Sequence, residues 1–147
     1  MAIIVEDGSI VANANCYVSE AEYEAWSEAR YGVRDDLNAE AELLKAMDVF
    51  EAMKFRGYRV SASQALSFPR YGFYIDGDIQ ESDSIPALVK TVVMELAWMS
   101  ESGTLNSGCI KRVKLENIEE EYSSPSSISN ISKSLSRLLG PLSVVRA

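Results

Sequence analysis

The chain has 147 residues, of which 47% are hydrophobic and 24% are charged, and its formal net charge is −8. This length predicts one globular domain. Histidine is absent, which excludes a Ser-His-Asp triad, a Cys-His pair and a histidine-ligated metal. The two cysteines, Cys16 and Cys109, form no C-x-x-C pair and are expected to be reduced thiols. The composition therefore argues against an enzyme and against a metal or other cofactor.

Charge is unevenly distributed along the chain. Residues 1–55 contain 12 acidic and 4 basic residues, whereas residues 107–147 contain 4 acidic and 6 basic residues. Such asymmetry indicates that different faces of the protein meet different surroundings. The apolar run at residues 3–5 is too short for a secretory signal, and the run at 85–99 is too short to span a bilayer. We therefore expect a protein that is made in the cytoplasm and does not contact membranes.

Local signals predict three helices in the first two thirds of the chain. Ser19, with a glutamate three residues later, forms a capping box that starts a helix, and Gly32 ends this helix. A second amphipathic helix begins near Asn38, and a third begins at Pro86. The residues that recur at helical spacing in the first helix are Ala21, Ala25, Trp26 and Ala29.

Two further segments read as β-structure. Residues 3–5 and 10–11 are apolar and flank Asp7-Gly8, which is typical of a β-hairpin turn. Residues 109–122 alternate in part and predict a second hairpin or a pair of strands. The expected fold class is therefore mainly α, a helical bundle with small β-hairpins.

The C-terminal part begins with a serine-rich link at residues 123–127 and continues as an amphipathic helix. We divide the chain into a helical core domain, residues 1–122, and a C-terminal link and helix, residues 123–147. An apolar stripe recurs at steps of three and four residues, at Ile128, Ile131, Leu135, Leu138 and Leu142. The stripe needs a surface to dock on. This surface is either the protein's own core or another chain, and the sequence does not distinguish between them.

The segment from 56 to 84 is long, rich in glycine and aromatic residues, and without a sustained period, as functional connections often are. Arginines alternate there with aromatic residues, a composition found in sites for single-stranded nucleic acid. The overall negative charge opposes this interpretation. Under the other interpretation, the aromatic residues cover the edge of the core and the arginines pair with neighbouring acids. The acidic cluster Asp76, Asp78, Glu81 and Asp83 lacks the spacing of a calcium loop and is expected to be a solvated loop.

Several stretches, in their order and spacing, resemble one family of phage proteins. They are Ala14–Glu22, Ala46–Arg59, Phe68–Gly72, Ile85–Ala97 and Val113–Tyr122. This pattern is similar to that of tailed-phage head-to-tail connector (adaptor) proteins, including the group labelled DnaT-like single-stranded-DNA-binding proteins. Phe68 stands where members often carry Trp, and Asn117 stands where members often carry Gly; both keep the physical role of the residue they replace.

The resemblance implies a structural virion protein. Such a connector forms a dodecameric ring under the portal, extends the DNA channel and provides the platform for neck and tail proteins. Its partners would be the portal protein, a downstream neck, stopper or tail-completion protein, other copies of itself, and duplex DNA passing through the lumen. The alternative is a DnaT-like replication accessory protein that binds single-stranded DNA.

The resemblance also implies two sets of contact residues. The arm that docks on the portal or another partner would use Ile128, Ile131, Leu135, Leu138, Leu139, Leu142, Val144, Val145 and Arg146. Contacts between subunits or through the long loop would use Arg56, Tyr58, Arg59, Phe68, Arg70, Tyr71, Phe73 and Tyr74.

Overall fold

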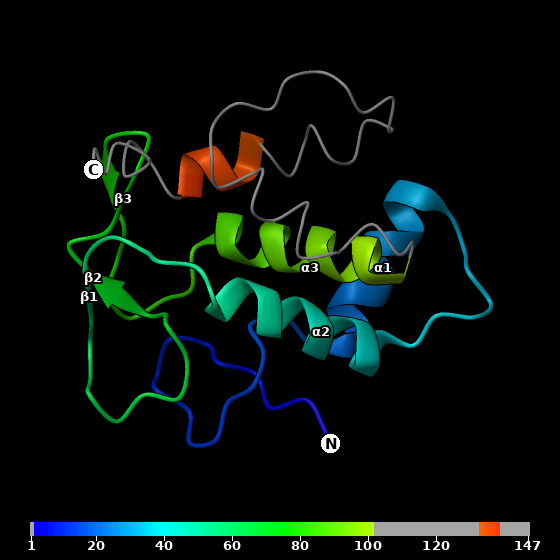
Figure 1. Ribbon diagram of the computed structural model, residues 1–147, viewed down its shortest axis with the longest axis horizontal. Coiled ribbons are helices and arrows are strands. Elements are labelled where there is room, and N and C mark those ends of the chain that lie inside the picture. Colours follow the sequence, from blue (N-terminus) through cyan, green and yellow to red (C-terminus); the bar gives the residue numbers. More distant parts are fainter. Residues whose placement is uncertain (1, 102–132, 139–147) are drawn as a thin grey trace.

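The computed structural model describes residues 2–101 and 133–138. Its helices are α1 (Glu20–Tyr31), α2 (Ala39–Glu51) and α3 (Ala87–Glu101), followed by a short helical stretch at 133–138 (Figure 1). Between α2 and α3 lie two antiparallel pairs of very short strands. These are β1 (Tyr58–Arg59) with β2 (Arg70–Tyr71), and β3 (Tyr74–Ile75) with β4 (Asp78–Ile79). The described residues therefore form a mixed α/β structure, whereas the sequence predicts a mainly α fold, a helical bundle with small β-hairpins.

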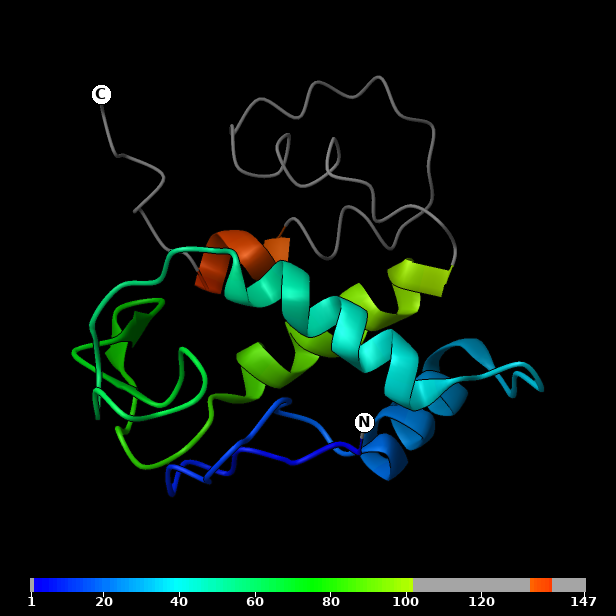
Figure 2. The same cartoon turned by 60° about the horizontal axis from the view of Figure 1, so that its bottom comes forward.

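Helix α3 is the centre of the fold. Its sequence is apolar on nearly every side, as expected for a helix surrounded by other elements. Val89, Val92 and Val93 are fully buried, and Leu96 is nearly so. Figure 2 shows α2 crossing over α3, and α1 also packs against both helices.

The helix boundaries follow from capping interactions that the sequence predicts. The Ser19 side chain accepts a hydrogen bond from the backbone N–H of Glu22 at 3.2 Å, and the N–H of Gly32 donates to the Glu28 carbonyl at 2.9 Å. The Asn38 side chain accepts from the N–H of Ala41 at 3.1 Å and starts α2. The predicted helix starts at Ser19 and Asn38 are confirmed.

The buried face of α1 differs from the predicted one. Its buried residues are Tyr23 and Ser27, with Trp26 half-buried, whereas the three alanines of the expected stripe are exposed. A tyrosine ring buries far more apolar surface than an alanine methyl group. The large residues therefore determine which face of α1 packs against the core.

The predicted N-terminal hairpin is wrong. The Glu6 side chain is fully buried, and its carboxylate accepts hydrogen bonds from the N–H groups of Gly8, Ile10 and Val11 at 2.9 Å each. The chain therefore curls around its own carboxylate instead of forming a strand ladder. Val5 forms a single parallel bridge with Cys16. Side-chain bonds to the local backbone compete with sheet pairing, and here they prevail.

The short helical stretch at 133–138 packs on the rest of the protein. Leu135 and Leu138 are 2% and 1% exposed and belong to the same buried cluster as the three helices. Arg137 donates to the Asp76 carboxylate at 2.8 Å, which ties this stretch to the turn between β3 and β4. For these two leucines, the observation favours the chain's own core over a partner as the docking surface.

The other expectations for the tail lie outside the described residues. They are the hairpin at 109–122, the link at 123–127, and the docking residues Ile128, Ile131, Leu139, Leu142, Val144, Val145 and Arg146. Within 2–101 and 133–138, no helix has both the length and the apolar character needed to cross a membrane.

Candidate nucleic-acid interface

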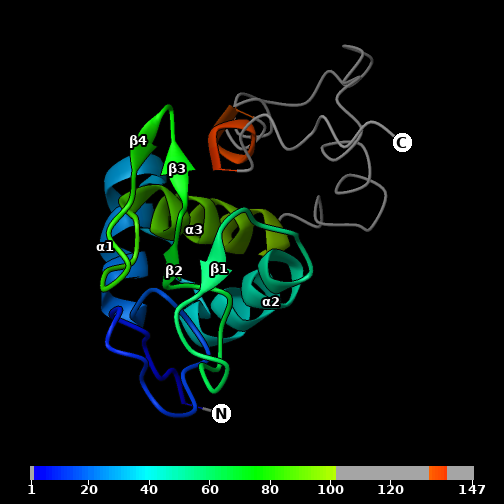
Figure 3. The same ribbon diagram turned by 90° about the vertical axis from the view of Figure 1, so that its left-hand side faces the viewer.

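The two strand pairs lie together at one end of the protein, where α2 finishes and α3 begins (Figures 1 and 3). In the β1–β2 ladder, Tyr58 is opposite Tyr71 and Arg59 is opposite Arg70. Neighbouring residues of a strand point to opposite faces, so the two tyrosines share one face and the two arginines share the other.

The tyrosine face is open to solvent. Tyr58 is 69% exposed and Tyr71 is 50% exposed, and their ring centroids lie 5.5 Å apart at an angle of 32°. We call these two residues the tyrosine pair. Each ring contacts the other and still offers exposed π-surface, which is the geometry that an unpaired base can stack on.

The β3–β4 ladder also exposes large apolar side chains. Tyr74 is 51% exposed and stands opposite Ile79, which is 63% exposed. Large apolar side chains that stay in solvent on neighbouring strands commonly mark a binding surface. Each of the two ladders therefore exposes a pair of large apolar side chains.

Two of the aromatic residues expected at a contact surface are core residues instead. Phe68 and Phe73 are each 1% exposed, and their rings meet edge to face at a centroid distance of 5.0 Å. Phe68 also packs against Phe50 of α2 and against Tyr17. The expectation that the aromatic residues of this segment cover the core is thus correct for the phenylalanines and wrong for Tyr58, Tyr71 and Tyr74.

Arg59 and Arg70 bond to backbone carbonyls rather than to the acids that one interpretation expects. Arg70 donates to four carbonyl oxygens, at Phe55, Arg56, Gly57 and Ser67. Arg59 donates to the carbonyl of Gln64. Burial, and the positive charge of Arg59, lower the pKa of the Arg70 guanidinium.

Two cations that precede Tyr58 closely in the sequence have free side chains. Arg56 and Lys54 are exposed, and neither side chain has a partner within residues 2–101 and 133–138. Residues 52–75 contain four basic residues and no acidic residue, in a chain whose formal net charge is −8. The charge screening length in physiological salt is about 8–10 Å, so the local potential depends mainly on charges within that distance. The tyrosine pair therefore lies in a locally positive segment.

A partly buried hydrogen-bond network joins α2 and Tyr17 to the segment that leads into β2. The Tyr17 hydroxyl donates to Glu51 Oε1 at 2.7 Å and accepts from the N–H of Phe68 at 3.0 Å. Glu51 Oε2 accepts from both the N–H and the hydroxyl of Ser67, at 2.9 and 2.7 Å. Burial and the negative charge of Glu51 raise the pKa of Tyr17 far above its ordinary value. Sequence reasoning missed this network because its members are far apart in the chain and form no motif.

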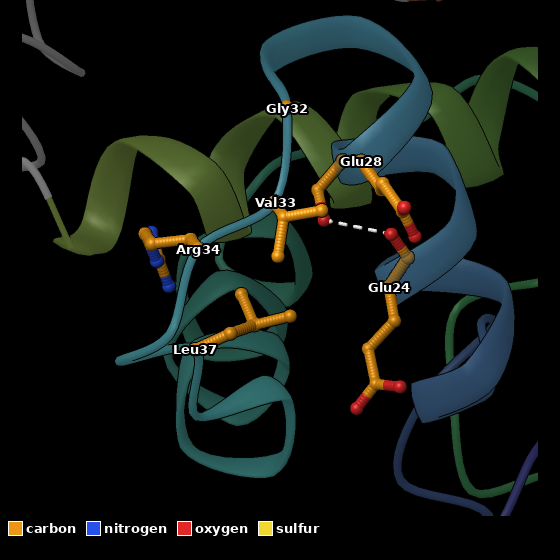
Figure 4. Close-up of a pocket in the computed structure, with 7 residues that line it drawn as sticks. Glu24, Glu28, Gly32, Val33, Arg34 and Leu37 are labelled. Atoms are coloured by element: carbon orange, nitrogen blue, oxygen red, sulfur yellow. Dashed lines mark hydrogen bonds between the residues drawn. The ribbon is translucent and has the colours of Figure 1, made fainter.

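A shallow hollow of about 280 Å³ lies near the C-terminal end of α1 (Figure 4). Glu24, Glu28, Val33 and Leu37 are among the residues that line it. Arg34 also lines it but is paired with Asp36 and Glu42, so the hollow offers two carboxylates and no free cation to a phosphate backbone. Within the part of the chain that the structure describes, no group of three or more Cys, Asp or Glu residues could hold a metal ion.

The chain was compared with curated proteins, with solved structures and with known families. Neither the curated proteins nor the solved structures gave a match. The family described as "Putative DnaT-like ssDNA binding protein" matches residues 1–147. The connector function that the resemblance implies stays a prediction, because none of these comparisons bears on it. Since the family match spans the whole chain, the protein belongs to this DnaT-like family.

Proposed function

We propose that the protein binds single-stranded DNA through the tyrosine pair on β1–β2. The observation that carries the proposal is the exposure of two contacting tyrosine rings, opposite each other on the ladder, within a segment that has four basic and no acidic residues. The description of the family also names single-stranded DNA.

The physical basis is base stacking assisted by local positive charge. Every base has a π-face, so an aromatic platform tolerates sequence and contributes about 1–3 kcal/mol per stacked base. In a duplex those faces are already covered by neighbouring base pairs, so the platform favours single strands. Arg56 and Lys54 are exposed and lie close to Tyr58 in the sequence. In this proposal they contact the phosphates beside the stacked bases.

The first test measures binding of a fluorescently labelled oligothymidine strand by anisotropy. Alanine at Tyr58 or at Tyr71 is expected to weaken binding about 5- to 150-fold, the range that the stacking free energies correspond to. Phenylalanine at either position keeps the ring and is expected to retain the affinity. Val33→Ala removes another exposed apolar side chain, 77% exposed, from the edge of the hollow, and serves as the control.

The second test follows the affinity as salt is added. Each phosphate contact on a single strand contributes about 0.7 to the slope of log affinity against log salt. Arg56→Ala is expected to lower this slope by about that amount. Lys45→Ala, which removes an exposed cation from α2, should leave it unchanged. Absence of wild-type binding at low salt, or wild-type affinity in the Tyr58→Ala/Tyr71→Ala double variant, would contradict the proposal.

A further inference from the structure

Arg70 lies on the face of β1–β2 opposite the tyrosine pair, and its guanidinium is spread across carbonyl oxygens. Its Nε donates to Arg56 at 2.7 Å, and its Nη2 donates to Gly57 at 2.8 Å and to Phe55 at 3.3 Å. Its Nη1 donates to Ser67 at 3.2 Å. Four of the five N–H donors of the side chain are therefore used on the protein's own backbone.

These contacts join the two segments that lead into the ladder. The carbonyls at 55–57 precede β1, and the carbonyl at 67 precedes β2. A two-residue ladder has little stability of its own, since even an isolated hairpin is at best marginally stable in water. The ladder also places Arg59 opposite Arg70, and like charges directly opposite each other are destabilising. Something besides strand pairing must therefore hold the ladder together, and the Arg70 side chain spans the right atoms.

We propose that Arg70 is a positioning residue for single-stranded DNA: it holds Tyr58 and Tyr71 side by side through the backbone and makes no phosphate contact. This inference rests on the proposed function. It also separates Arg70 from Arg56, although both are arginines of the same basic segment. Arg56 acts through its charge, whereas Arg70 acts through the planar geometry of its donors.

The discriminating experiment compares Arg70→Ala, Arg70→Lys and Arg56→Ala in affinity for oligothymidine over a range of salt. Both Arg70 variants are expected to weaken binding by at most the loss expected for one stacking ring, roughly 5- to 150-fold. The slope of log affinity against log salt is expected to stay unchanged. Lysine keeps the charge but carries a compact ammonium that cannot reach four carbonyls at once, so it gives no rescue. Arg56→Ala lowers the slope by about 0.7.

A double-mutant cycle tests whether Arg70 acts through the tyrosines. In a background that already carries Tyr58→Ala and Tyr71→Ala, Arg70→Ala is expected to weaken the remaining binding by less than about twofold, because coupled residues are not additive. A residue that only maintained the global fold would lower binding in both backgrounds alike. The folded fraction of every variant is measured by circular dichroism beforehand.

A measurement on the wild-type chain covers the case in which the Arg70 variants do not fold. The side-chain Nε–H signals of the arginines are followed by NMR as oligothymidine is added. The Arg70 signal is expected to exchange slowly with solvent and keep its position, whereas the Arg56 signal shifts.

Four results would overturn the inference: wild-type affinity in Arg70→Lys, a drop in salt slope in Arg70→Ala as large as in Arg56→Ala, an equal loss of binding on Arg70→Ala with and without the two tyrosines, or a DNA-induced shift of the Arg70 signal as large as that of Arg56. If the wild-type protein does not bind the strand at all, the proposed function fails as a whole, which is a different outcome.

Discussion

Gly57 and Gly72 show at the scale of single residues how the ladder is built. Both have a positive φ, 71° and 65°, which costs any other residue about 1–2 kcal/mol. A Cβ atom on Gly57 would lie 2.4 Å from the carbonyl oxygen of Tyr71, whereas a Cβ atom on Gly72 would have nothing within 4 Å. Gly57 is therefore required for its backbone angle and also for the close approach of β1 to β2.

The two glycines form a matched pair of substitutions. Gly72→Ala is expected to lower the free energy of unfolding by about 1–2 kcal/mol. Gly57→Ala should lower the free energy of unfolding by more than this, because the backbone at Tyr71 must also move. It should also weaken DNA binding. Urea denaturation and anisotropy measure the two effects. Equal stability and equal binding of the two variants would contradict the role given to Gly57.

Glu95 is a buried residue that is expected to make the stability of the protein depend on pH. Its side chain is 3% exposed, Oε1 lies 3.5 Å from Arg30, and Oε2 has no partner among the residues that the structure describes. Burial raises the pKa of Glu95, and the charge of Arg30 opposes this shift. The folded state therefore holds the proton more tightly than the unfolded state, so stability falls as pH rises through the folded pKa.

Glu95→Gln removes this pH dependence. The variant is expected to be more stable than the wild type at neutral pH, because the amide that replaces the buried carboxyl carries no charge at any pH. The difference should disappear below the ordinary pKa of 4.5, where the carboxyl is protonated in both states. Urea midpoints measured across this range check the prediction, with Glu28→Gln on the exposed face of α1 as the control. A lower stability of Glu95→Gln at neutral pH would show that the Arg30 pair outweighs burial.

At the scale of elements, the Tyr17 hydroxyl is one of the groups that link α2 to the strand region. The Tyr17 hydroxyl joins Glu51 at the end of α2 to the N–H of Phe68. Tyr17→Phe leaves the buried N–H without its acceptor, which costs about 1–3 kcal/mol. The variant is expected to lower the urea midpoint and loosen the ladder, seen as faster amide exchange at Tyr58 and Tyr71.

Tyr74→Phe is the control for this substitution, because Tyr74 is 51% exposed. It should leave the urea midpoint unchanged. If Tyr17→Phe is as stable as this control, the hydrogen bonds of the Tyr17 hydroxyl do not stabilise the contact between α2 and the strand region.

At the scale of the whole molecule, the C-terminal stretch at 133–138 completes the core. Leu138 is 1% exposed and Ser136 is exposed. Leu138→Ala is expected to cost about 2–5 kcal/mol, the usual range for a buried leucine, whereas Ser136→Ala should cost little. Deletion of residues 126–147 should destabilise the protein for the same reason. A truncated protein with wild-type stability would support a docking arm and hence the connector prediction.

The features of this protein that could be predicted from the sequence are those that depend on residues close to one another along the chain. The starts of α1 and α2 follow from Ser19 and Asn38, because a cap acts over three residues. The alternation of arginines and aromatics left a nucleic-acid surface on segment 56–84 as one of two interpretations, and the exposure of Tyr58 and Tyr71 is consistent with that one. Charge and the absence of histidine limited the possible chemistry from the start.

Tertiary structure decided which residues of that segment face solvent and what its arginines do. Two-residue strands carry no readable period, so the β1–β2 ladder could not be predicted. Phe68 is buried by rings from α2 and from Tyr17, which are distant in sequence. Arg70 is held by carbonyls on both sides of the ladder, and a carbonyl is present at every residue, so no sequence pattern marks those that bind it.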